Sequence, residues 1–240
     1  DGGYHDNLPV LMAMFRGAEN IIAVDLREVG SVDRRFLAEV EEFHPSFMYI
    51  EPSHDLGNFL VFDPAAAARN VRLGYLDGMK SFGLLEGVYY TFEPGAFPGE
   101  DIGGAEWAAQ IFGADDEKIY TRGGFLKFLK DEVAREYLTE PKDILRSGPF
   151  SIRKAAQALK RGISRKAVTL YIADAAASGS LERITGSRIG GAAIESAPGE
   201  RIIGDEISAA SFIAKYGLAD GEKALPETGG EGTLPGPGEE

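Results

Sequence analysis

The sequence predicts an α/β fold over its first part and a mainly helical fold beyond it. Two short runs, residues 21–26 and 47–50, are apolar and rich in β-branched or aromatic residues, as buried parallel strands are. Helix-periodic segments lie before, between and after these runs with short connections, which is the pattern of a layered sheet covered by helices. A Gly/Pro-rich stretch after Pro94 separates this part from a series of helical segments.

The first two helices are predicted from their caps and from their apolar spacing. Asn7 is a plausible N-cap, and Pro9 occupies the first turn of a helix that should run to about Ala18. A second helix, capped by Ser31 or Asp33, should bury one apolar face between the two strands. The residues on that face are Phe36, Leu37, Val40 and Phe43.

A longer helix is predicted from Pro64 to about Leu85. We expect its apolar side to face the core, and its arginines and Asp77 to lie on a more hydrated face. The apolar positions are Val71, Leu73, Tyr75, Leu76, Met79 and Phe82.

The remaining chain is predicted to be helical as far as residue 219. Pro94-Gly95, Pro98-Gly99 and Gly103-Gly104 are interpreted as a subdomain boundary. Helices are expected at about 104–113, 125–138, 151–161, 165–177 and 205–216. The sequence thus divides into residues 1–93, a helical extension at 94–219, and an acidic Gly/Pro tail at 220–240 that is too poor in apolar residues to fold.

The composition excludes several classes of protein. A net charge of −13, from 38 acidic and 25 basic residues, argues against a nucleic-acid-binding protein and against simple attraction to anionic lipid surfaces. The absence of cysteine excludes disulfides and a thiolate nucleophile; it fits a cytoplasmic protein, which we expect, and equally a bacterial secreted one. No apolar run approaches the roughly 20 residues that span a bilayer.

The most informative segment is the N-terminal stretch that begins Asp1-Gly2-Gly3. This tight turn precedes the Asn7-Leu8-Pro9 helix start and a strand that ends in Val24-Asp25. That arrangement resembles the second signature of the patatin-like phospholipases. Three segments farther on, Leu56-Gly57, Phe62-Asp63 and 73–78 (Leu-Gly-Tyr-Leu-Asp-Gly), resemble the downstream part of bacterial members, so the likeness covers about residues 1–93.

The resemblance implies a three-layer α/β domain and a lipid acyl hydrolase that uses a Ser–Asp dyad. In that family a serine in a Gly-x-Ser-x-Gly elbow attacks the ester, and by position Asp1 is its general base. Gly2 and Gly3 form the turn that presents the carboxylate, and Asn7 and Pro9 support the motif. The substrate would be a phospholipid or another acyl ester, and neither a metal nor an organic cofactor is implied.

The sequence contains no nucleophile elbow to accompany Asp1. No serine has glycine at both −2 and +2, and the nearest match, Ser164 in 162–166 (Gly-Ile-Ser-Arg-Lys), is interpreted as a helix cap. The Gly-rich oxyanion loop is also missing. We therefore interpret the chain as the downstream fragment of a longer protein, and expect it to be inactive alone.

Two alternatives to a hydrolase remain at this point. The first is a degenerate, non-catalytic patatin-like domain with a binding or regulatory role. The second is a flavodoxin-type or Rossmann-type domain, which would need a Gly-rich phosphate loop directly after a strand that the sequence does not show.

Several other features are interpreted without a catalytic role. The histidines His5, His44 and His54 match no metal-ligand spacing and are expected on the surface or in loops. Asp6 is expected to serve the start of the first helix. The Leu-Pro-Glu-Thr-Gly run at 225–229 matches a sortase signal but lacks the hydrophobic segment that must follow it. Aromatic and apolar residues at helical spacing in the extension are expected to be core. They are Trp107, Phe112, Phe125, Phe128 and Leu129.

Overall fold

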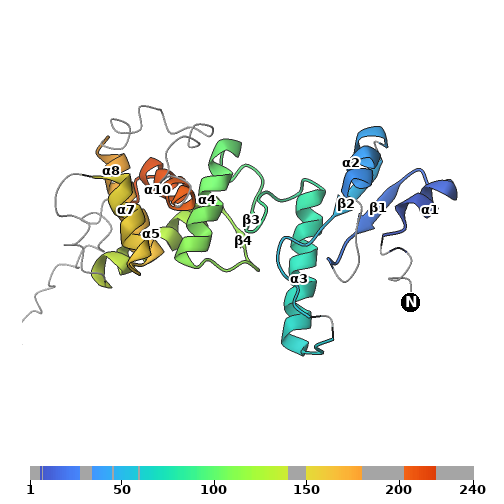
Figure 1. The fold of residues 1–240 in the computed structure, drawn as a ribbon, viewed down its shortest axis with the longest axis horizontal. Coiled ribbons are helices and arrows are strands. Elements are labelled where there is room, and N and C mark those ends of the chain that lie inside the picture. Colours follow the sequence, from blue (N-terminus) through green and yellow to red (C-terminus); the bar gives the residue numbers. More distant parts are fainter. Residues whose placement is uncertain are drawn as a thin grey trace, which may run out of the picture.

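The protein is described by a computed structural model that combines helices with two small parallel sheets (Figure 1). The described residues are 6, 8–27, 34–44, 46–58, 60–139, 150–179 and 203–219. No helix in these ranges is long and apolar enough to cross a membrane. The predicted caps Ser31 and Asp33 and the predicted tail lie outside them.

The first part of the chain has the predicted helix–strand–helix–strand order. Its elements are α1 (Val10–Phe15), β1 (Ile21–Val24), α2 (Arg34–Phe43) and β2 (Phe47–Ile50). The two strands pair in parallel, with Ile21 opposite Phe47 and Val24 opposite Ile50, which confirms the α/β prediction for this segment. Both strands are covered on one face by a small core. It consists of Val10, Ile21, Ala23, Leu37, Val40 and Phe47.

The prediction for α2 is right for three of its four apolar residues. Leu37 and Val40 are buried, and Phe36 packs against the same core. Phe43 is 77% exposed instead, because the helix ends on this residue and the chain turns away toward β2. The helical period placed it on the correct side of α2, but the core does not extend so far along the helix.

The long helix α3 (Pro64–Ser81) begins where the sequence predicts. Asp63 caps it by accepting hydrogen bonds from the backbone N–H groups of Ala65 and Ala66, at 3.2 and 3.3 Å. Its predicted orientation is partly wrong, because Asp77 is buried at 6% exposure on the inner side of the helix, together with Leu73 and Leu76.

The opposite side of α3 faces solvent although it is apolar. Val71 is 75% exposed, and Tyr75 and Phe82 are about half exposed. The expectation of an apolar inner face and a hydrated charged face is therefore wrong for these positions. The inner face combines two leucines with charged residues that have partners in neighbouring loops.

A second small sheet connects α3 to the helical part. It consists of β3 (Thr91–Phe92) and β4 (Ile119–Tyr120), which pair in parallel. Along the chain, α4 (Gly99–Phe112) lies between these two strands. The predicted break at Gly103-Gly104 is wrong, since both glycines lie inside α4. A Cβ on Gly104 would come within 3.1 Å of the Phe212 Cβ and of the Ser208 carbonyl oxygen. This glycine therefore allows a close helix crossing and does not end a helix.

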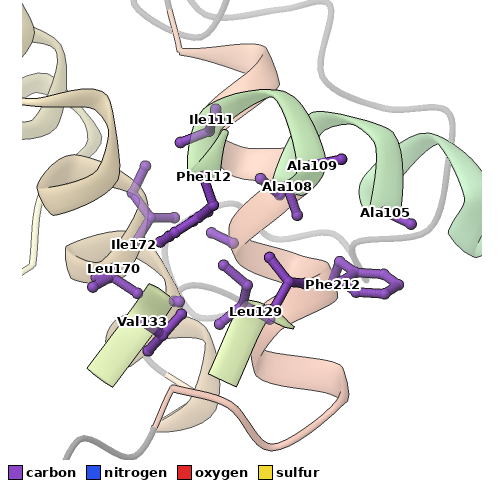
Figure 2. Packing of buried hydrophobic residues seen from close by; sticks show 14 of the residues in the cluster. Ala105, Ala108, Ala109, Ile111, Phe112, Leu129, Val133, Leu170, Ile172 and Phe212 are labelled. Carbon is purple, nitrogen blue, oxygen red and sulfur yellow. The ribbon is translucent and has the colours of Figure 1, made fainter. Parts of the chain in front are cut away.

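The helical part matches its predicted segments closely. Its remaining helices are α5 (Arg122–Thr139), α7 (Ile152–Lys160), α8 (Arg165–Ala177) and α10 (Gly204–Lys215). Helix α10 packs chiefly against α4 and α8, and their small and branched side chains interdigitate (Figure 2). The aromatic positions expected in the core lie there: Phe112, Phe125 and Leu129 are buried, while Trp107 and Phe128 pack against the cluster.

A buried carboxylate joins the first turn of α4 to the end of α10. Asp101 accepts hydrogen bonds from the Lys215 ammonium, at 2.7 Å to each oxygen, and from the Tyr216 hydroxyl at 2.7 Å. Burial, together with this hydrogen bond to a carboxylate, raises the pKa of Tyr216 to about 12. These hydrogen bonds fix the C-terminal end of α10 against the start of α4.

The loop before β3 is held by a single carboxylate from α4. Glu106 Oε1 accepts the backbone N–H groups of Val88, Tyr89 and Tyr90, at 2.6, 2.7 and 3.1 Å. Gly87 begins this loop with a φ of 101°, and a Cβ there would meet the Tyr90 carbonyl oxygen at 2.1 Å. Three charge-assisted hydrogen bonds thus fix this loop, and its first position accommodates only glycine.

Replacing Glu106 by alanine should lower the free energy of unfolding by about 3 kcal/mol, because three N–H groups lose a charged acceptor. Urea melts followed by circular dichroism would measure the change. Glu100→Ala is the matched control, since this exposed residue lies in the first turn of the same helix. Its loss should cost about 0.5 kcal/mol through the helix dipole. Equal effects in the two variants would show that Glu106 does not hold the loop.

Candidate functional site

The predicted catalytic motif lies mostly outside the described residues. Asp1, Gly2, Gly3 and Asn7 are among the residues that are not described, as is His5. The predicted N-cap at Asn7 and the predicted place of Pro9 in the first turn are wrong, because α1 begins at Val10 and Pro9 is its N-cap residue. Asp6 accepts a hydrogen bond from the backbone N–H of Leu8 at 2.9 Å, which orders the turn that leads into the helix.

The carboxyl ends of β1 and β2 bring together the polar residues of this part of the chain. Asp25 directly follows β1, and its two oxygens accept the Tyr49 hydroxyl at 2.6 Å and the Arg27 backbone N–H at 2.7 Å. The Arg27 guanidinium reaches Glu51, after β2, at 2.8 Å. Ligand sites of open parallel sheets lie at this end of the strands, so these residues border the place where a site in the α/β part is expected.

The backbone at Arg27 is the one non-glycine position with a positive φ among the described residues, at 53°. Left-handed backbone is unfavourable for a residue with a Cβ, and such positions often adjoin functional sites. Here the hydrogen bond to Asp25 and the ion pair with Glu51 hold the turn. Val24-Asp25 is part of the segment that resembles the patatin-like signature. In the structure, Asp25 fixes the backbone just after the end of β1.

A second cluster begins just beyond β2 and rests on α3. Asp77 accepts the backbone N–H of Ser53 at 3.0 Å and forms an ion pair with Lys80 at 2.9 Å. Both charged side chains are almost fully buried, at 7% and 10% exposure. Lys80 also donates to the Val88 carbonyl oxygen, so its ammonium group joins α3 to the loop before β3. Removing either member would leave the other as an unpaired buried charge, which would destabilise the fold.

His54 lies at the centre of this cluster between a hydroxyl and a carboxylate. Its Nδ1 is 2.9 Å from Ser53 Oγ, and its Nε2 is 3.4 Å from Asp116 Oδ2. The Tyr89 ring packs edge-on against the imidazole with centroids 5.9 Å apart. These contacts fit a neutral imidazole that accepts from Ser53 through Nδ1 and directs its Nε2–H toward Asp116.

The pKa of His54 is lowered from its ordinary value of 6.5, mainly because burial removes water from the charged form. The charges around it act in both directions. Asp116 and Asp77 raise the pKa, whereas Arg69 and Lys80 lower it. Arg69 holds Asp116 at 2.6 Å, which satisfies this carboxylate without a charged histidine.

The order Ser53, His54, Asp116 resembles a nucleophile with its base and orienting carboxylate. Acyl transfer also needs donors directed at the developing oxyanion. The N–H of Ser53 is bound to Asp77, and the guanidinium of Arg69 is bound to Asp116. Arg72 likewise donates to the Glu117 carbonyl oxygen at 2.9 Å. The cluster therefore acts as a polar joint between α3 and the loop at 114–118.

Two further expectations can be compared with the structure. Ser164 is confirmed as a helix cap, because its hydroxyl accepts the Ala167 backbone N–H at 3.1 Å at the start of α8. Within the described ranges, no three His, Asp or Glu residues come together in a way that could hold a metal ion.

Sequence reasoning placed His54 in a loop but did not connect it with Asp116 or with α3. The carboxylate lies 62 positions away along the chain (116 − 54), beyond the reach of any local pattern. One signal was available: Arg69, Arg72, Asp77 and Lys80 recur at helical spacing along a single face of α3. Such a charged stripe can pack against other parts of the protein, and not only face water, when each charged group has a partner.

Comparisons with protein-family models, with curated proteins and with solved structures found no match.

Stability should depend on pH through His54. Its lowered pKa favours the neutral form in the folded protein, so this stabilisation is complete above pH 6.5 and is lost as the pH falls through the folded-state value. Urea melts at about pH 7.5 and about pH 5.5 should show a lower free energy of unfolding at the acidic value.

A His54→Asn variant should lose this part of the pH dependence. His44→Asn is the matched control, because His44 lies beyond the end of α2, away from the cluster. If the free energy of unfolding of His54→Asn still changes as much between these pH values, the charge of His54 does not cause the pH dependence.

Proposed function

We propose that the chain forms the downstream part of a patatin-like, three-layer α/β lipid acyl hydrolase. In the intact protein, a serine supplied by a preceding segment attacks the ester and Asp1 acts as its general base. Residues 94–219 form an extension of this domain. The observation that supports the proposal best is the uncovered apolar face of the β1–β2 pair.

This face lies opposite the small core of the first part. Ile22 and Val24 alternate with buried neighbours along β1 and are 58% and 56% exposed. Parallel sheets are covered on both faces in known α/β proteins, since their strands are apolar on both sides. A further layer is therefore expected over β1, and its free edge offers a place for additional strands.

Neighbouring elements expose further apolar side chains. On α1, Leu11 and Met12 are exposed and Phe15 is 85% exposed; Leu26 follows β1 and is also exposed. Monomeric proteins seldom expose many large apolar side chains close together, so these residues also support the presence of a covering partner. A preceding segment that adds strands and helices would cover them.

The proposed chemistry follows from the Asp1-Gly2-Gly3 sequence motif, which precedes α1 along the chain. A serine hydroxyl is a weak nucleophile until a base takes its proton, and a carboxylate can do so when it is positioned beside the hydroxyl. The two glycines allow the tight backbone turn that such a position requires. The nucleophile and the oxyanion N–H groups would come from the preceding segment, and acyl transfer would proceed through an acyl-serine.

The direct test joins the chain to its preceding genomic segment and measures hydrolysis of a short-chain nitrophenyl ester. The joined protein should turn over, the 240-residue chain alone should not, and Asp1→Asn should lower kcat in the joined protein by about a thousandfold. Asp6→Asn is the matched control, since Asp6 contacts only the turn before α1 in the described residues. It should retain activity within about threefold.

Undiminished activity in Asp1→Asn would disprove the assignment of the base. A joined protein that folds without hydrolysing the ester would instead favour the degenerate, non-catalytic alternative.

The uncovered face makes a separate prediction. Ile22→Lys should change the free energy of unfolding of the 240-residue chain by less than about 1 kcal/mol, because this side chain is exposed there. In the joined protein the same lysine would be buried without a partner, which should cost several kcal/mol. Melts of both proteins would measure the difference. A harmless Ile22→Lys in the joined protein would show that the preceding segment does not cover β1.

A further inference from the structure

Helix α7 and its C-terminal turn concentrate positive charge in an acidic chain. Residues 150–173 contain six of the 25 basic residues and no Asp or Glu, although the whole chain has a net charge of −13. The six residues are Arg153, Lys154, Lys160, Arg161, Arg165 and Lys166. The charge of this segment is therefore opposite to that of the protein as a whole.

Two of these six are neutralised by partners within the fold. Arg165, at the start of α8, binds Glu206 at 2.5 Å and Asp205 at 3.2 Å. Lys166 binds Glu132 at 3.1 Å. These pairs fasten α8 to α10 and α5, and so serve the packing of the helical part.

The other four belong to α7 or to its C-cap. Within the described part of the chain, no ion pair involves Arg153, Lys160 or Arg161, and all three are exposed. Lys154 lies over the Tyr171 ring, with its Nζ 5.7 Å from the ring centroid. We define these four residues, Arg153, Lys154, Lys160 and Arg161, as the basic strip.

The helix period places the basic strip on one side of α7. Its members, together with the exposed Gln157, follow the spacing i, i+1, i+4, i+7 and i+8, which is a single helix face. The other side carries the buried alanines Ala155, Ala156 and Ala158. Alanine brings the helix close to the core, so the long basic side chains extend from a firmly seated surface.

We propose that the basic strip docks the protein on the headgroups of an anionic phospholipid surface. This inference rests on the proposed lipid acyl hydrolase function, for which such a surface presents the substrate. A row of long cations along one side of a short amphipathic helix, three of them exposed, complements a plane of single negative charges. The net charge of −13 opposes attraction at a distance, whereas the strip acts at contact, within a Debye length of the surface.

The structure favours a lipid surface over a nucleic acid. After α7, the chain turns through Gly162 into α8, where a nucleic-acid-binding protein would place its groove-reading helix. The two cations of α8 are Arg165, which is paired with Glu206, and Lys166, which is paired with Glu132. Helix α8 thus offers no unpaired cation to the phosphates that border a groove.

Figure 1 shows α7 at one end of the long axis of the molecule and α1 at the other. The basic strip is therefore remote from the position proposed for the active site. It serves as a tether that raises the local concentration of the protein at the lipid surface, and it takes no part in the chemistry.

The test measures co-sedimentation of the 240-residue chain with vesicles at about 0.1 M salt. The chain should bind phosphatidylcholine vesicles that contain about 30 mol% phosphatidylserine, and not those of phosphatidylcholine alone. A variant with Lys160→Gln and Arg161→Gln should bind about 25-fold more weakly, since each charge near such a surface contributes about fivefold.

The matched control is the variant with Lys127→Gln and Lys130→Gln on α5. It changes the net charge by the same amount, and Lys127 is exposed and pairs with Asp131 on its own helix. Its binding should change by less than about twofold. Circular dichroism would verify that both variants are folded.

Equal losses in the two variants would overturn the proposal by showing an effect of bulk charge alone. Binding that does not require phosphatidylserine would also overturn it. A third overturning result is binding of a DNA duplex, lost with Lys160→Gln and Arg161→Gln, in the absence of vesicle binding. The proposed hydrolase function is tested independently, because the short-chain ester is soluble and needs no vesicle.

Discussion

The polar stripe along the inner face of α3 holds the two parts of the chain together. Its charged members bind backbone or side chains on both sides of the helix: Asp77 takes the N–H of Ser53 after β2, while Arg69 and Arg72 bind the loop at 114–118. Lys80 reaches both Asp77 and the loop before β3. Buried charges cost free energy unless each is paired, so the stripe also requires its partners to stay in place.

Local signals were sufficient to predict most of the elements. The bounds of α8 agree with the predicted 165–177, where Ser164 caps the helix and Gly162 turns the chain before it. Strand β1 ends two residues earlier than the apolar run suggests, because Asp25 binds the N–H of Arg27 and turns the backbone out of the strand. The helix predicted at 104–113 begins earlier, at Gly99, and the prediction missed its first residues because it interprets the Gly103-Gly104 pair as a break. Glycine is a weak helix former, but Gly104 lies where α10 approaches closely, with 3.1 Å left between a Cβ and the Phe212 Cβ.

The orientation of α3 could not be predicted from its own residues. Its apolar positions define two stripes, and the period alone does not tell which one is covered. Leu73 and Leu76 lie on the inner stripe, whereas Val71 and Tyr75 lie on the outer one. The choice was set by loops far along the chain, which bring acceptors for the arginines of α3. For the same reason His54 could be placed in a loop from the sequence, but not beside Asp116.

The distribution of charge shows why a net value is a poor guide to surface chemistry. The acidic excess opposes attraction to anionic surfaces while the protein is farther from them than a Debye length. At contact, the potential depends on which charges are paired. Arg165 and Lys166 are paired with Glu206 and Glu132. Lys160 and Arg161, a few residues earlier, at the end of α7 and its C-cap, are exposed. The fold thus divides one basic segment into a paired group and an exposed group. The first two hold the helices together, and the second two face outward from the bundle.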